Sequence, residues 1–354
     1  IKVIAYNNYV AALDRVESIR ARLETDLNKR SFRADKQILY DGYIRLSVEL
    51  YGAKAGLEAL ERAKARDLLD LMATREIDFN NPLASGEQNL RREITRQVIP
   101  NEADNRAAAP NTLPADAVER YRAIVVKIKK AAPELASLIS VDTLSYREIA
   151  ALVPPRSALC AYHIARDYGF IFTVVNGQAR VVKLDLDRRA LTDKIQRFRD
   201  AILNKASVQA QARDLYHLLV RPVEKDLQVE RMIVVPDNTL FYLPFSALSD
   251  GSTYLIERYS LAYTPSMGIL KFAKTKARSK SGRVLALGNP DLGNPDLALP
   301  SAQVEAQTVA SRFPGSQVYV AKQATETIAR TAASQFDIIH FATHGEFSSA
   351  DPLY

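Results

Sequence analysis

The residues best suited to chemistry are His344 and Gly345, which follow an apolar run in the segment FDIIHFATHGEF. A histidine can take up and return a proton near neutral pH. A glycine beside it leaves its backbone N–H unshielded, so a substrate oxyanion could reach this donor. Together the two suit acyl transfer, because the histidine moves the proton while the amide stabilises the tetrahedral oxygen.

Acyl transfer also needs a nucleophile, and Cys160 is the only cysteine among the 354 residues. A lone cysteine with a histidine elsewhere is a fair candidate. Cys160, however, lies inside the apolar run SALCAYHIA, where a cysteine usually acts as a small buried hydrophobic residue. His163 follows three residues later, which places it on the opposite face of a strand. We therefore expect Cys160 to be structural.

The other histidines predict no further catalyst. His340 lies within a strand expected to be buried, so we expect a neutral, hydrogen-bonded core residue. His217, in DLYHLLV, is expected on an ordinary helix. His340 and His344 have the spacing of zinc ligands on a helix, but here the spacing crosses a strand end with no cysteine nearby. We expect no metal ion, and the lack of a glycine-rich phosphate loop predicts no cofactor.

Alternating strands and helices must position His344. From residue 157 onward, short β-branched or aromatic runs alternate with helical segments, which predicts a mostly parallel sheet flanked by helices. Reactive groups in such sheets lie beyond the carboxyl ends of strands. Strand 283–287 leads into Gly288-Asn-Pro290, and strand 336–342 leads into His344. The runs VLALG and IIHFA lack polar alternation, which predicts buried central strands, and NPDLGNPDL predicts a pair of turns.

The N-terminal part predicts helices instead. Leucine, valine and isoleucine recur there with a helical period, and Gly52 separates two of the apolar stripes. Residues 78–117 are rich in Asn, Ala, Pro and Gly, which is typical of loops, and residues 118–128 predict one more helix. We thus expect three parts: helical hairpins over 1–77, a loop and helix linker over 78–144, and an α/β domain over 145–354.

Composition bounds the class of protein. The chain is 25% charged and 47% hydrophobic with a net charge of +7, which is ordinary for a globular protein and excludes disorder along its whole length. A single cysteine excludes a disulfide-stapled scaffold. No apolar run is long enough to span a bilayer, and no signal peptide is evident, so we expect no membrane contact and a cytoplasmic location. The basic stretch 271–283 predicts a solvated loop, with polyanion binding or a trypsin-like nick site as the alternatives.

Several blocks, taken in order, resemble the CHAT domain, a caspase-like peptidase family that commonly follows tetratricopeptide repeats. They are RMIVVPDNTLFYLPFSALSD, RVLALGNPD, LPSAQVEAQTVASRF, DIIHFATHGEF and the final DPLY. The resemblance covers about residues 145–354, and residues 45–73 resemble the last hairpin of a tetratricopeptide array. Both ends of the sequence look cut, so we expect a longer gene product.

The resemblance implies an α/β caspase-like fold and a cysteine endopeptidase of the caspase and separase kind. His344 corresponds to the catalytic histidine and Gly345 to an oxyanion-hole amide. The nucleophilic cysteine is expected on the next core strand, beyond Tyr354, since in caspases it lies about 50 residues after the histidine.

For function, we expect cleavage of a protein substrate, regulated by a protein partner that binds the helical repeats. The resemblance makes a prokaryotic defence or signalling role possible, including association with an RNA-guided effector complex. The competing hypothesis is a non-catalytic scaffold that keeps the fold and lacks the nucleophile.

Overall fold

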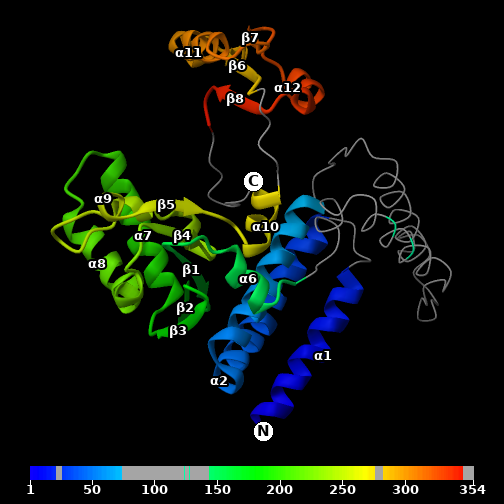
Figure 1. Cartoon of the computed structure of the whole chain (residues 1–354), viewed down its shortest axis with the longest axis vertical. Coiled ribbons are helices and arrows are strands. Elements are labelled where there is room, and N and C mark those ends of the chain that lie inside the picture. The colour runs from blue at the N-terminus through cyan, green and yellow to red at the C-terminus, as the bar shows by residue number, and fades with distance from the viewer. Residues whose placement is uncertain (21–25, 74–122, 124–126, 128–142, 276–281, 346–354) are drawn as a thin grey trace. The chain divides into compact units, whose positions relative to one another are not determined.

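A computed structural model describes residues 1–20, 26–73, 123, 127, 143–275 and 282–345 (Figure 1). They belong to two compact units, Ile1–Ala273 and Lys274–Tyr354. Most of the expected linker lies outside the described residues, as do residues 276–281 of the basic stretch and the final segment DPLY. The division into 1–77, 78–144 and 145–354 stays a prediction.

The first unit begins with the expected helical region. Helices α1 (Lys2–Arg20) and α2 (Asp26–Ala73) run side by side (Figure 1). Gly52 interrupts α2 with φ 81° and ψ −165°, a left-handed conformation that glycine adopts without steric cost. The predicted stop at Gly52 is therefore confirmed, and α2 consists of two helical segments. The ring of Tyr6 on α1 packs against Tyr43 and Tyr51 on α2, with centroids 5.6 Å and 5.1 Å away.

The α/β part of the first unit follows. Its strands are β1 (Ser157–Ile164), β2 (Gly169–Val175), β3 (Gln178–Leu184), β4 (Arg231–Val235) and β5 (Ser260–Tyr263). Its helices are α6 (Tyr146–Leu152), α7 (Arg188–Leu203), α8 (Gln209–Leu219), α9 (Leu255–Arg258) and α10 (Met267–Thr275), with short 3₁₀ turns at Arg221–Asp226, Asn238–Tyr242 and Phe245–Ala247.

The five strands lie in the order β3-β2-β1-β4-β5. β1 pairs in parallel with β4, and β4 with β5, whereas the β1–β2 and β2–β3 pairs are antiparallel. Asn176 and Gly177 connect β2 to β3 with φ values of 49° and 72°, the left-handed pair that a two-residue hairpin requires. The Asn-Gly dipeptide between two apolar runs is the sequence signal for this hairpin.

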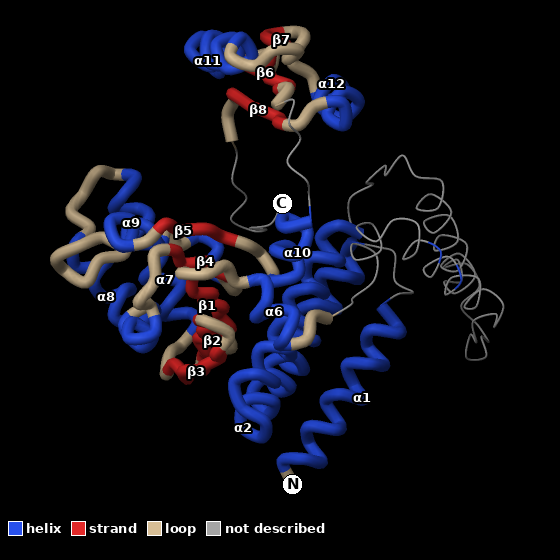
Figure 2. The backbone as a smooth tube through the Cα atoms, in the orientation of Figure 1, coloured by secondary structure: helices blue, strands red, loops and turns tan. Residues whose placement is uncertain are grey.

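Alternate residues of β1 face two different helical layers. Cys160 and Tyr162 belong to a core with α7 and α8, whereas Leu159 and Ala161 pack in a second core with α2, α6 and α10. Figure 2 shows these helices on either side of the strands. The helical region and the sheet thus share a core, because α2 supplies much of one covering layer.

The second unit contains β6 (Val284–Pro290), β7 (Gln317–Ala321) and β8 (Ile338–Ala342), with α11 (Pro300–Ser311) and α12 (Glu326–Ala332). Short 3₁₀ turns occupy Pro295–Leu297 and Ala333–Gln335. The order is β7-β6-β8, and both pairings are parallel. α11 packs on Val284 and Ala286 of β6, and α12 covers Leu285 and Leu287 on the opposite face.

The α/β fold class with a preceding helical region is confirmed, and four of the six strand pairings are parallel. The strands fall into two sheets, one in each unit. VLALG forms the buried central strand β6, as expected. The same expectation for IIHFA is wrong: within its own unit β8 pairs only with β6, and Phe341 is 58% exposed.

A buried ionisable cluster joins α2 to the carboxyl ends of β1 and β4. His163 on β1 lies with its Nε2 atom 3.3 Å from Asp41 Oδ1 and its Nδ1 atom 3.7 Å from Asp237 Oδ2. Lys64 Nζ donates to Asp237 Oδ1 at 3.1 Å and to the Pro236 carbonyl at 2.5 Å. Asp41 Oδ1 and His163 Nε2 have no hydrogen-bond partner within the described part of the chain. Two carboxylates face one ammonium here, so an additional proton balances the buried charge.

Burial shifts both members of the Asp41–His163 pair toward their neutral forms. Desolvation, followed by the charge of Asp237, raises the pKa of Asp41 from 3.8 to about 7. Desolvation lowers the pKa of His163 from 6.5 to about 4, against the opposing effect of Asp237. A proton between Asp41 Oδ1 and His163 Nε2 would satisfy both atoms at once.

Glu61 is a second buried carboxylate on α2. Its two oxygens accept from the backbone N–H groups of Met267 and Gly268, at 2.9 and 2.7 Å, at the start of α10. Desolvation raises its pKa from 4.5 to about 7, although these hydrogen bonds oppose the shift. The second half of α2 therefore caps the helix that ends the first unit.

We predict that the protein loses stability as pH rises through this range. Between about pH 4.5 and 7 the folded chain retains protons on Asp41 and Glu61 that the unfolded chain has lost, whereas His163 in the unfolded chain binds a proton up to about pH 6.5. The folded state thus binds more protons overall, so the free energy of unfolding falls with pH and levels off above about pH 8.

Asp41→Asn isolates the contribution of this carboxyl, because the amide can donate to His163 Nε2 at every pH. We expect the decline to become shallower by at most about 1.4 kcal/mol per pH unit, the value for one proton. Urea unfolding followed by circular dichroism from pH 5 to 8 measures the slope. Asp185→Asn is the control, since Asp185 is exposed. An unaltered slope in Asp41→Asn contradicts the prediction.

Candidate functional site

His344 and Gly345 lie just past the carboxyl end of β8, next to the end of the central strand β6. Ala342 at the end of β8 is in register with Gly288 of β6. The two strand ends singled out in the sequence are thus neighbours in one parallel sheet. His344 and Gly345 are both exposed, which is the placement that open α/β sheets give to reactive groups.

One hydrogen bond fixes the His344 ring. Its Nε2 atom lies 2.8 Å from the carbonyl oxygen of Leu297, in the short 3₁₀ turn before α11. A carbonyl can only accept, so the bond assigns the proton of the neutral ring to Nε2. Nδ1 therefore carries the lone pair, and within the described residues it has no partner. The ring is oriented with its basic nitrogen available.

The turns of residues 289–297 could be predicted from the sequence, but their presentation of this carbonyl to His344 could not. Asn289 adopts φ 48° where the β6–β7 register shifts, and its Oδ1 atom accepts from the Leu299 N–H at 2.7 Å. Such an irregularity at a strand end redirects a side chain. The available signal was the Asn directly after Gly288, since asparagine tolerates the left-handed region.

The predicted pair of turns in NPDLGNPDL is confirmed. Asp291 Oδ1 accepts from the Gly293 N–H, and Asn294 Oδ1 accepts from the Asp296 N–H, both at 3.0 Å. Each is a short side-chain bond to the backbone two residues ahead, the signature of an Asx turn. The doubled motif therefore forms a loop of two hydrogen-bonded turns that ends at Leu297.

Gly345 is open on the side where a side chain would lie. Among the described residues, a Cβ placed on it meets no atom within 4 Å, and its amide has no acceptor. A backbone donor in this state can serve an incoming oxyanion.

His340 differs from the expected core histidine. Its side chain is 28% exposed, and its Nε2 atom lies 3.0 Å from Glu305 Oε1 on α11. The expectation of a hydrogen bond is confirmed and that of burial is wrong, because β8 has only one neighbouring strand in the described unit. His217 lies exposed on α8, as predicted.

Cys160 has the properties of a structural residue. It is 0% exposed, and burial, with a smaller effect of Asp226, raises the pKa of its thiol to about 12. His163 points to the opposite face of β1, into the layer with α2. The predicted separation of the two is confirmed. In the residues described, no group of three His, Cys, Asp or Glu side chains is arranged to hold a metal ion.

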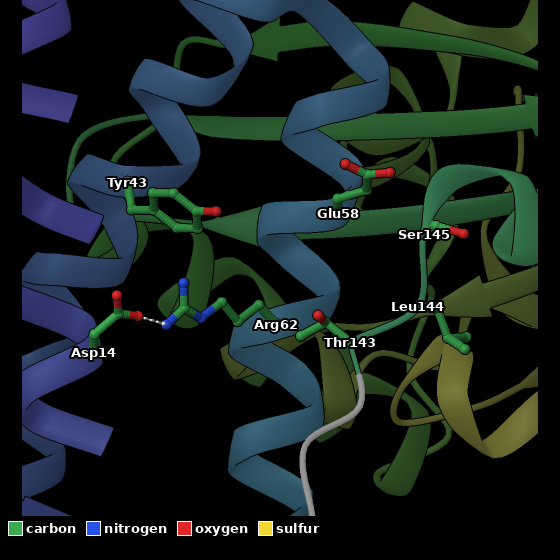
Figure 3. Close-up of a pocket in the computed structure, with 7 residues that line it drawn as sticks. All are labelled: Asp14, Tyr43, Glu58, Arg62, Thr143, Leu144 and Ser145. Carbon is green, nitrogen blue, oxygen red and sulfur yellow. Dashed lines mark hydrogen bonds and ion pairs between the residues drawn. The ribbon is translucent and has the colours of Figure 1, made fainter. Parts of the chain in front are cut away.

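A polar groove of about 540 Å³ lies in the first unit (Figure 3). Its lining residues are Asp14, Tyr43, Glu58, Arg62, Thr143, Leu144 and Ser145. Arg62 donates to Asp14 at 2.6 Å, and Glu58 Oε1 accepts from the Tyr146 N–H at 2.6 Å. These contacts tie α1 and the start of α6 to α2, so its charged groups already serve the fold.

Comparison with known proteins gives a family match and two similar sequences. Residues 209–353 match the family model of the CHAT domain. The chain is 31% identical over 156 residues to tetratricopeptide repeat protein 28 of Homo sapiens and of Mus musculus. Each match covers 37% of this chain and 6% of the relative, so the chain spans a small part of the relatives' length. None of the described helices is long and apolar enough to cross a membrane.

We predict that Gly288→Ala destabilises the second unit. A Cβ there lies 2.6 Å from the Ala306 Cβ and 2.8 Å from the Ala302 carbonyl oxygen, and such overpacking costs about 1–3 kcal/mol. Hydrogen exchange of the β6 and β8 amides, resolved by mass spectrometry, should accelerate. Gly345→Ala introduces the same methyl group into open space and should leave these rates unchanged. Equal rates in Gly288→Ala and the parent chain contradict the prediction.

We also predict that Cys160 does not react with a maleimide in the native chain and reacts fully in urea, because the thiolate is the nucleophile and this thiol is buried. An Ala298→Cys variant, whose added thiol is exposed, should take up one label under native conditions. Labelling of the unmodified native chain would show that Cys160 is accessible.

Proposed function

We propose, from the match of residues 209–353 to the CHAT domain, that this chain carries the histidine and oxyanion-hole part of a cysteine endopeptidase. The observation that carries the proposal is the Nε2 hydrogen bond of His344 to Leu297, 2.8 Å long. It leaves a basic Nδ1 atom at an exposed strand end beside an open glycine amide.

In the proposed mechanism, His344 Nδ1 takes the proton of a thiol, which then attacks the scissile carbonyl. The imidazolium keeps its Nε2–H bond to the Leu297 carbonyl, whose partial negative charge stabilises the cation. The Gly345 N–H donates to the developing oxyanion. His344 then returns the proton to the leaving amine, and the acyl-enzyme is hydrolysed in a second step.

The thiol in this proposal is not Cys160. A buried thiol with a pKa raised to about 12 supplies almost no thiolate. The proposal therefore requires a nucleophilic cysteine from outside these 354 residues, as the resemblance implies.

The proposed regulation uses the helical region. A protein partner that binds α1 and α2 can influence the five-stranded sheet of the first unit, because Asp41, Glu61 and Lys64 on α2 contact its strand ends and α10. A cytoplasmic location, a role in prokaryotic defence and association with an RNA-guided effector rest on the family resemblance alone.

We predict that His344→Ala in the full-length protein lowers kcat/KM by at least about 100-fold, the lower range for loss of a general base. The measurement uses a positional library of fluorogenic tetrapeptides, with circular dichroism to verify that the fold is kept. His217→Ala is the matched control, because this histidine is exposed on α8, and it should retain full activity.

Two outcomes decide against the proposal. Retained turnover in His344→Ala removes the assigned role of this residue. If the parent protein neither cleaves the library nor reacts with peptidyl acyloxymethyl ketones, which alkylate an activated thiol, the non-catalytic scaffold is the better description.

A further inference from the structure

We propose that Glu305 and His340 form a positioning pair that holds the strand end carrying His344; this inference rests on the proposed function. Neither residue contacts the reacting groups. Glu305 Oε1 on α11 and His340 Nε2 on β8 are 3.0 Å apart. Their role would be to fix where β8 lies along α11.

β8 depends on polar contacts because few of its apolar side chains are buried. Ile338 and Ile339 are each 43% exposed and Phe341 is 58% exposed, whereas residues 284–287 of the neighbouring β6 are buried. Ala342 is the one residue of β8 in the buried core beneath α11. A strand with so little buried side-chain area is held mainly by its hydrogen bonds.

Two side-chain hydrogen bonds near the carboxyl end of β8 lead to the same segment. His340 and Ala342 share one face of the strand, opposite Ala286 and Gly288 of β6, and this face is covered by α11. His340 reaches Glu305 on α11, and His344 reaches Leu297 in the turn that precedes it. Glu305 and Leu297 therefore both attach the carboxyl end of β8 to α11 and the turn before it.

α11 packs tightly on β6, so its position relative to that strand is fixed. It approaches β6 so closely that a Cβ on Gly288 would lie 2.6 Å from Ala306. Asn289 also binds the Leu299 N–H at the helix start. If the Glu305 contact is lost, the structure that can shift is β8, and a shift along its axis changes the distance from His344 Nε2 to the Leu297 carbonyl.

The expected effect is graded, because the Glu305 side chain is 56% exposed and exposed pairs contribute modestly. In the full-length protein, Glu305→Ala should lower kcat about 3–10-fold on a fluorogenic peptide and leave KM within twofold. Glu305→Gln retains a hydrogen-bonding oxygen and should stay within twofold of the parent in kcat. Glu326→Ala removes a glutamate paired with Arg330 on α12 and should change neither constant.

A second measurement does not depend on cleavage. In the 354-residue chain with ¹⁵N-labelled histidine, ring NMR should show His344 as the Nε2–H tautomer. Glu305→Ala should shift the His344 signals toward mixed tautomers, and Glu326→Ala should leave them in place.

The outcomes separate the two proposals. Unchanged kcat and unchanged His344 signals in Glu305→Ala overturn the positioning role even if the protein is a peptidase. If the parent protein cleaves nothing while Glu305→Ala still shifts the His344 signals, the proposed function fails and the positioning pair stands.

Discussion

The close contact between α11 and β6 is the constraint on which the candidate site depends. Gly288 has no side chain, so the helix lies directly on the end of the central strand, against Ala302 and Ala306. This contact brings the turn before α11 beside β8, so that Leu297 can accept from His344. A larger residue at 288 would lift the helix and move the carbonyl with it. The geometry of the histidine therefore follows from a packing requirement at a residue without functional groups.

Much of the fold could be predicted from the sequence because local signals agreed with each other. The Asn-Gly hairpin, the Gly52 interruption and the capping box at Ser145 and Glu148 each coincide with a local sequence signal. Each depends on the conformational limits of a few neighbouring residues. The exposure of β8 could not be predicted in this way, since its apolar run resembles that of the buried strand β6. Among the described residues β6 has two neighbouring strands and β8 has one, and the number of neighbours is a property of the whole sheet.

The residues of the candidate site also divide into those that local sequence signals predict and those that depend on the whole fold. His344 and Gly345 could be singled out because their residue types carry chemistry and follow a strand end. Leu297 could not, because it contributes only a carbonyl oxygen, which every residue possesses. Glu305 and His340 are 35 positions apart and meet only because α11 crosses over β8. Side-chain type thus indicates which residues can react. The groups that orient those residues, such as a backbone carbonyl, cannot be recognised from residue type.

Three ionisable side chains of α2 are largely buried and determine how the helix packs, unlike the exposed His344 of the candidate site. Asp41, Glu61 and Lys64 are largely buried against the sheet, where an apolar residue would avoid the cost of desolvation. Each is matched to one partner, namely His163, the start of α10 or Asp237. Apolar packing tolerates sliding, whereas a buried charge is stable only opposite its own partner. These contacts therefore specify one register of the helical region on the sheet. The same specificity makes the register sensitive to proton binding, because two of the three groups are carboxyls whose pKa is raised to about 7.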